Sequence, residues 1–254
     1  MKKQVLQTII GSVITAAGLA AVILTRSQAL AEGAGDGEKL LFAFSLIALI
    51  IGVVVIVTAY AKPARKTDVM TLTLAAMMAA LCYVAFAFFK IDIPVGTEKT
   101  AFHLGNTFCV LASLFLGGLW GGLSGAVGMT IGDFFGGYVT SAPKTFLLKL
   151  GIGLVTGLIA HKVLKIDEEK DWKKVTWKSA VAASCGMAFN VVAEPLFGYV
   201  YKRYLFGLEQ NIASTLAKIG AGTTLVNAVI AVIAATVFYL ALRPVLTRIR
   251  KEKS

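Results

Sequence analysis

The sequence predicts an all-α protein, a polytopic bundle of membrane-spanning helices. Hydrophobic residues make up 57% of the 254 residues, charged residues only 15%, and the mean hydropathy is +0.78. A soluble domain usually carries about 25% charged residues. The apolar residues gather in runs of about 20, the length that a helix needs to cross roughly 30 Å of hydrocarbon. These features exclude a soluble globular enzyme, a disulfide-stapled secreted domain and a disordered chain.

Eight apolar runs are expected to span the membrane. They lie at approximately 5–24, 39–60, 69–89, 106–120, 121–137, 144–163, 179–200 and 219–242. Lysine and arginine are retained on the cytoplasmic side of a membrane, and here they cluster in residues 1–4, 61–68, 161–178 and 243–254. We therefore expect a multi-pass protein of the cell membrane with both termini in the cytoplasm. The net charge of +11 then belongs to this inside rim, and we expect no nucleic-acid partner.

Alternation of the spans predicts which connections face outwards. The outside loops are expected at 25–38, 90–105, 138–143 and 201–218, and an uncharged inside turn is expected near Trp120-Gly121-Gly122. The first run allows a second interpretation, because Ala29-Leu30-Ala31 resembles the cleavage site of a signal peptide. We favour a retained helix, since the run exceeds the usual 7–15 apolar residues of a signal. Cleavage would leave seven spans.

The basic stretch 61–68 is the expected boundary between two parts of the chain. Residues 1–68 then hold two N-terminal transmembrane helices and a linker, with almost no polar groups inside the spans. Residues 69–245 hold a core of six helices, and residues 246–254 form a basic cytoplasmic tail.

Motifs for enzyme chemistry, cofactors and metals are missing from the sequence. There is no G-x-x-x-x-G-K-[ST] loop for nucleotide phosphates and no G-x-S-x-G nucleophile motif. The glycine-rich stretch 117–125 is expected to pack helices closely. Cys82, Cys109 and Cys185 lie in apolar runs and are interpreted as small buried hydrophobes. We expect neither an enzyme nor a cofactor or metal site.

Polar residues at membrane depth are the main candidates for a functional site, because each is costly there. Asp133, Lys149, Asn190, Glu194 and Asn227 all fall in the outer half of the expected topology. Asn190 and Glu194 are one helical turn apart and so share a face. The alternative is a structural role, with hydrogen bonds between helices and a buried ion pair of Lys149 with Asp133 or Glu194.

The outside loop 90–105 is long for a membrane hairpin and mixes charges, aromatic residues, proline and glycine. It is either a solvated connector or a lid over a cavity. Its length and its position above the same leaflet favour the lid.

The middle of the chain contains an ordered series of motifs: 97–106 (TEKTAFHLGN), 116–118 (LGG), 121–128 (GGLSGAVG), Asp133 and 142–146 (APKTF). This series resembles the substrate-binding S component of energy-coupling factor (ECF) vitamin transporters, and within that family the riboflavin-type branch. The resemblance covers about residues 69–245, and the two N-terminal spans are a departure from the six-helix family core.

The resemblance implies a subunit that captures a small water-soluble vitamin or related heterocycle outside. A membrane coupling subunit and two cytoplasmic ATPases would be its partners, together with membrane lipids. Expected substrate-binding residues are His103, Asn106, Asp133, Tyr138, Lys149, Asn190, Glu194 and Asn227. Phe102, Phe134, Phe135, Tyr199 and Tyr201 are further aromatic residues that could stack on a flat ring.

In that family, small residues on the first core helix contact the coupling subunit. Ala75, Ala76, Ala79 and Ala80 form two overlapping A-x-x-x-A pairs that suit helix docking; packing within the chain is the alternative. An independent secondary transporter, with Asp133 or Glu194 carrying a coupling proton, is the competing function. The lack of a detectable internal repeat is evidence against it.

Overall fold

The computed structural model describes residues 2–29, 41–42, 45, 48–49, 52, 68–95 and 98–251. Most of the expected second span, 39–60, and nearly all of the basic linker therefore lie outside the described residues. Two compact units form, one from residues 1–62 and 201–208 and the other from residues 63–200 and 209–254.

The first unit contains helix α1 (Lys2–Ala29), whose apolar stretch Leu6–Thr25 is long enough to cross a membrane. Gly18 lets the backbone of α1 approach the backbone of Leu49, since an added Cβ atom would lie 2.5 Å from the Leu49 nitrogen. A Cβ atom added at Gly52 would likewise lie 2.5 Å from the backbone nitrogen of Thr15. Small residues at such positions allow close contact between membrane helices. The expected first span, 5–24, agrees with this helix.

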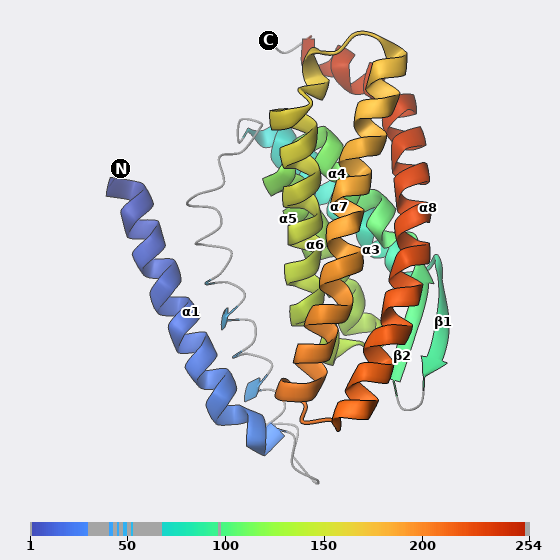
Figure 1. Cartoon of the computed structure of the whole chain (residues 1–254). Helices are drawn as coiled ribbons and strands as arrows, with labels where there is room; N and C mark the ends of the chain where they lie inside the picture. Colours follow the sequence, from blue (N-terminus) through green and yellow to red (C-terminus); the bar gives the residue numbers. More distant parts are fainter. Residues whose placement is uncertain are drawn as a thin grey trace. The chain divides into compact units, whose positions relative to one another are not determined.

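In the described part of the chain, six α-helices form most of the second unit (Figure 1). They are α3 (Val69–Ala87), α4 (Gly105–Leu116), α5 (Gly118–Gly136), α6 (Ala142–Gly157), α7 (Trp172–Val200) and α8 (Gln210–Lys251). Among the described residues, α1, α3, α6, α7 and α8 are long and apolar enough to span a membrane, and α4 is a shorter apolar helix. The expectation of an all-α membrane bundle is thus confirmed.

Helix α4 is the central helix of this unit. It packs against α3, α5, α6 and α8, and nearly every one of its residues is buried. The helix ends at Leu116 because the chain reverses direction at Gly117. The φ angle of Gly117 is +82°, a conformation that glycine adopts at little cost. The expected turn near Trp120-Gly121-Gly122 was therefore placed a few residues too late.

Glycines bring α5 close to α4 and α6. A Cβ atom added at Gly121 would lie 2.3 Å from the Cα of Ser113, and one added at Gly153 would lie 2.1 Å from the Cα of Gly122. Neither distance is possible between real atoms, so only glycine fits at these crossings. The predicted packing role of the glycine-rich stretch is confirmed.

The chain between α3 and α4 forms a hairpin of two antiparallel strands, β1 (Lys90–Val95) and β2 (Glu98–His103). Only a loop was expected there, because mixed charges hide the alternation of Ile91, Ile93 and Val95. Strand β2 lies beside α8 (Figure 1). Asn227 of α8 accepts a hydrogen bond from the backbone of His103 (3.0 Å) and donates one to Ala101 (3.0 Å). Its amide therefore pairs with β2 much as a neighbouring strand would.

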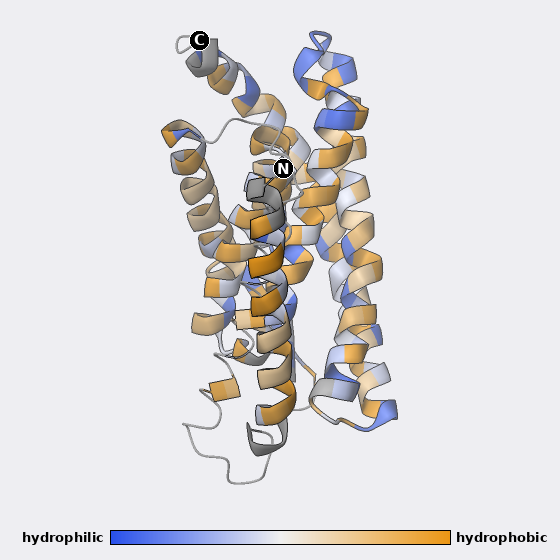
Figure 2. Ribbon diagram, turned by 90° about the vertical axis from the view of Figure 1, so that its left-hand side faces the viewer, coloured by the Kyte–Doolittle hydropathy of each residue, from blue (hydrophilic) through white to orange (hydrophobic). Residues whose placement is uncertain are grey.

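The opposite end of the unit is hydrophilic. The turn between α6 and α7, residues 158–171, is rich in charged residues and stands out in Figure 2. Arg243 of α8 donates hydrogen bonds to the carbonyl oxygens of Ile166 (3.1 Å) and Glu169 (2.6 Å). Helices α7 and α8 extend past the expected spans 179–200 and 219–242, so parts of the expected loops around them are helical.

Candidate functional site

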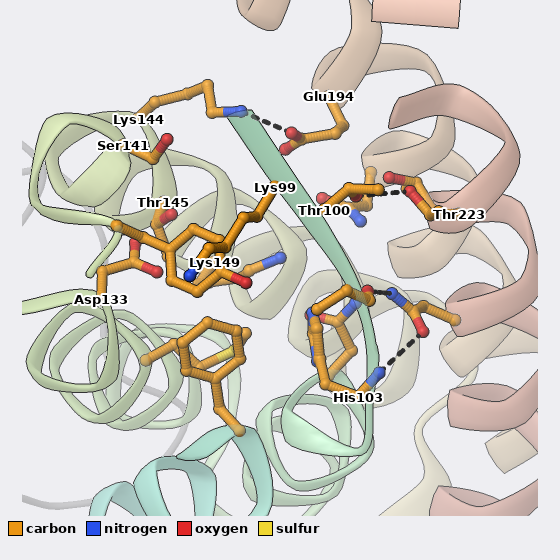
Figure 3. A pocket seen from close by; sticks show the side chains of 18 residues that line it. Lys99, Thr100, His103, Asp133, Ser141, Lys144, Thr145, Lys149, Glu194 and Thr223 are labelled. Carbon is orange, nitrogen blue, oxygen red and sulfur yellow. Dashed lines mark hydrogen bonds and ion pairs between the residues drawn. The ribbon is translucent and has the colours of Figure 1, made fainter. Parts of the chain in front are cut away.

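A cavity of about 110 Å³ lies beneath the hairpin, among the helices of the second unit (Figure 3). Its walls come from α3, β2, all five later helices and the short segment between α5 and α6. The lining residues are Phe86, Lys99, Thr100, Ala101, His103, Asn106, Met129, Asp133, Tyr138, Ser141, Lys144, Thr145, Lys149, Asn190, Glu194, Thr223, Thr224 and Asn227. All eight residues expected to bind substrate are among them.

An ion pair closes one side of the cavity. Lys144, in the first turn of α6, pairs with Glu194 of α7 (Figure 3), and the two side chains are 11% and 22% exposed. The ion pair considered from the sequence, between Lys149 and Asp133 or Glu194, is wrong, because Glu194 pairs with Lys144 instead. Both lysines line the cavity, and of the two only Lys144 lies within 4.0 Å of a carboxylate among the described residues.

Lys149 and Asp133 are the most deeply buried charged residues of the cavity, at 6% and 3% exposed. Among the described residues, no side chain forms an ion pair or hydrogen bond with the Lys149 ammonium group. The carboxylate of Asp133 lies beside the hydroxyl of Thr145, while its Oδ2 atom has no hydrogen-bond partner. Both groups are therefore available to a bound molecule.

Two asparagines add uncharged polar groups. Asn106 on α4 and Asn190 on α7 are each 1% exposed, and the side-chain oxygen of each lacks a hydrogen-bond partner in the described part of the chain. Buried polar atoms are almost always hydrogen-bonded in proteins. These two amides are thus suited to contact a polar ligand.

Strand β2 forms the roof of the cavity. The ring of His103 packs edge-on against Phe86 at 4.9 Å. Burial, helped by nearby Lys149 and Lys90, lowers the pKa of His103 to about 3, so the ring is neutral at physiological pH. Thr100 bonds to Thr223 of α8 through their hydroxyl groups at 2.9 Å. The roof therefore contributes neutral groups and is fastened to α8 at several points.

The other edge of the hairpin is fastened by Tyr138, which follows α5. Its hydroxyl donates to Asp92 of β1 at 2.6 Å, and the ammonium group of Lys90 lies 4.8 Å from its ring centre. Lys90 also pairs with Asp92 at 3.2 Å. The hairpin is thus anchored by hydrogen bonds on both sides.

Comparison with known families decides what kind of protein carries this cavity. The model of the family "ECF-type riboflavin transporter, S component" matches residues 66–244. The chain belongs to this family. It is a multi-pass membrane protein of a transporter family, and the match covers the entire cavity. Comparisons with curated proteins and with solved structures found no match.

The aromatic residues of this S component mostly face away from the cavity. Of the six residues expected to stack on a ligand ring, only Tyr138 lines it. Phe134 and Phe135 are 41% and 80% exposed. Phe86 is the aromatic residue that the sequence analysis missed. Phe86 and Tyr138 are therefore the phenylalanine and tyrosine side chains that line the cavity, and most of the other lining residues are polar.

Several polar lining residues were also missed. They are Lys99, Thr100, Ser141, Lys144, Thr145, Thr223 and Thr224. A signal existed for five of them. Lys99, Thr100, Lys144 and Thr145 lie in the quoted motifs 97–106 and 142–146, and Thr223 lies one turn before Asn227 on the same face of α8. Ser141 and Thr224 carry hydroxyl groups, which are too common in membrane proteins to be singled out.

The alanine stripe of α3 divides between two faces. Ala75 accepts a hydrogen bond from Ser124 of α5 through its backbone, and the backbone of Ala79 lies against Gly128 of α5. Ala76 and Ala80 are exposed. Within the S component, the exposed pair is thus the one that is open to another helix.

Proposed function

We propose that this S component captures a small, water-soluble, vitamin-like molecule outside the cell membrane and delivers it through a coupling subunit energised by two ATPases. The observation that supports this most strongly is the convergence of all eight expected residues on one cavity in a chain of this family. A cavity with a few placed polar groups is the usual form of a small-molecule site.

The distribution of charge supports the orientation of the site. Residues 161–178 carry six lysines, and the C-terminal part of α8 from Arg243 to Lys251 carries three arginines and one lysine. Both stretches favour a cytoplasmic position for that end. The cavity and the hairpin then lie toward the outside, where a nutrient is captured. Exposed apolar side chains such as Val192 and Ile233 would contact lipid.

The exposed alanines Ala76 and Ala80 are the proposed contact for the coupling subunit. Their small side chains leave a smooth surface on which a second helix can dock closely. Ala75 and Ala79 support this surface from behind, because they hold α3 against α5.

The experiment that tests the proposal identifies the bound compound and the source of energy that drives its uptake. The compound retained by the purified chain is extracted, identified by mass spectrometry and followed in whole-cell uptake. Uptake should stop when both ATPases are inactivated and should persist when a protonophore is added during ATP supply. Uptake that survives ATPase inactivation and stops with the protonophore would instead indicate a proton-coupled secondary transporter, with Asp133 or Glu194 carrying the proton.

A further inference from the structure

The charge of the cavity is unevenly balanced. Three lysines and two carboxylates line it, and Lys144 already pairs with Glu194. Lys99 is exposed on the hairpin, whereas Lys149 is buried, with a relative exposure of only 6%. Lys149 is therefore the buried cation whose charge the described residues leave without a direct partner.

A buried ammonium group is stable only when a negative charge or several acceptors compensate for its lost hydration. Asp133 and Glu194 are the carboxylates near enough to influence Lys149 electrostatically, and neither lies within 4.0 Å of its ammonium group. Glu194 is engaged by Lys144, and Asp133 is beside Thr145. An anionic group of a ligand would supply the missing partner.

Among the described residues, four other buried side-chain atoms of the cavity lack a hydrogen-bond partner. Three of them are acceptor oxygens, and the fourth is Nδ1 of His103, which can donate or accept in the neutral ring. The side-chain oxygens of Asn106 and Asn190 and the Oδ2 of Asp133 are buried and have no donor among the described residues. A ligand that satisfies them must carry hydroxyl or N–H groups. These same oxygens disfavour a second negative charge nearby, so a monoanion fits better than a dianion.

We propose that the ligand is a small, hydrophilic carboxylic acid whose carboxylate pairs with Lys149 and whose hydroxyl or N–H groups bond to Asn106, Asn190 and Asp133. This proposal rests on the proposed function and narrows its substrate from vitamin-like compounds to acids. The cavity volume of about 110 Å³ is below the roughly 300–1,000 Å³ of sites for drug-sized ligands, which favours a compact acid. The scarcity of lining aromatic residues agrees with this choice.

The test compares matched acids and neutral analogues on the purified full-length chain. The probes are nicotinate with nicotinamide and pantothenate with pantothenol; riboflavin and pyridoxine extend the neutral set, and pyridoxal 5′-phosphate represents phosphate esters. Binding is measured directly and by thermal stabilisation in detergent. At least one acid should bind, and its neutral analogue should bind at least tenfold more weakly.

Variants then locate the anion site. Lys149→Gln should weaken binding of the acid by about 10- to 100-fold and change binding of its neutral analogue little. Lys149→Arg should retain the preference for the acid. Lys218→Gln, an exposed lysine of α8 outside the cavity, should bind like wild type.

Three outcomes would overturn the inference: no acid binds the wild-type chain, a neutral compound binds more tightly than every acid, or the phosphate ester is preferred. The comparison within wild type does not depend on how the variants fold. Co-purification with the coupling subunit and ATPases separates the two proposals. A chain that assembles with them yet binds riboflavin refutes only the inference, and a chain that binds an acid yet never assembles refutes only the proposed function.

Discussion

Single polar side chains decide how this cavity recognises a ligand. Asn190→Ala removes an amide that is 1% exposed, and the loss of one hydrogen bond costs about 0.5–1.5 kcal/mol. At about 1.4 kcal/mol per tenfold change, the ligand should bind up to about tenfold more weakly. Asp133→Asn and Glu194→Gln should weaken binding more, because charged groups are involved.

These three variants are compared by titration with the compound that the purified chain retains, and Lys218→Gln is the control. Glu194→Gln should also lower the melting temperature, because it leaves Lys144 without its ionic partner. If all three variants bind the compound like wild type, the polar residues hold helices together and the ligand is recognised elsewhere.

At the scale of elements, the hairpin depends on Asn227. Asn227→Ala removes both hydrogen bonds between α8 and the backbone of β2. The lid should then open more easily, and the ligand should dissociate about tenfold faster or more, since each bond contributes about 0.5–1.5 kcal/mol. Stopped-flow or filter-binding measurements of the dissociation rate check this.

Asn211→Ala is the matched control for the hairpin, because Asn211 is exposed in the first turn of α8. An unchanged dissociation rate in Asn227→Ala would mean that Thr100, Thr223 and Tyr138 hold the lid without it.

The contact between α5 and α6 depends on glycine. Gly153→Ala would place a Cβ atom 2.1 Å from the Cα of Gly122, so the helices must separate. Overpacking of this kind costs about 1–3 kcal/mol, and the melting temperature in detergent should fall. Gly220→Ala on α8, where no atom lies within 4 Å, should keep or slightly raise it. Equal melting temperatures for the two variants would contradict the close contact.

At the scale of the whole molecule, orientation is the property to test. Ile91 on β1 is 69% exposed, and Lys173 at the start of α7 is exposed. Ile91→Cys should react with a membrane-impermeant thiol reagent in intact cells, and Lys173→Cys should react only after permeabilisation. The native cysteines Cys82 and Cys109 are buried and Cys185 is partly exposed, so labelling of the wild-type chain is measured as the background. The reverse labelling pattern would show that the hairpin faces the cytoplasm and would contradict the proposed orientation.

Much of the fold was predictable because membrane burial has a simple signature in sequence. Apolar runs located the helices, and the cost of polar groups in hydrocarbon singled out five of the eight expected residues that line one cavity. The pairing of Lys144, rather than Lys149, with Glu194 was not predictable, because hydropathy does not specify which faces of two helices meet. The turn at Gly117 was obscured by the glycines that follow it, each of which could have permitted a reversal.

The central claim is that this chain is the substrate-binding part of a larger importer. Co-purification of the tagged chain from its native membrane in mild detergent tests it most directly, with the proteins identified by mass spectrometry. Wild type and Val229→Trp, a substitution at an exposed position of α8, should bring down a coupling subunit and two ATPases. Ala76→Trp, with bulk on the exposed face of α3, should lose these partners while retaining its ligand. Purification of the wild-type chain without them, or retention of all three by Ala76→Trp, would contradict the account.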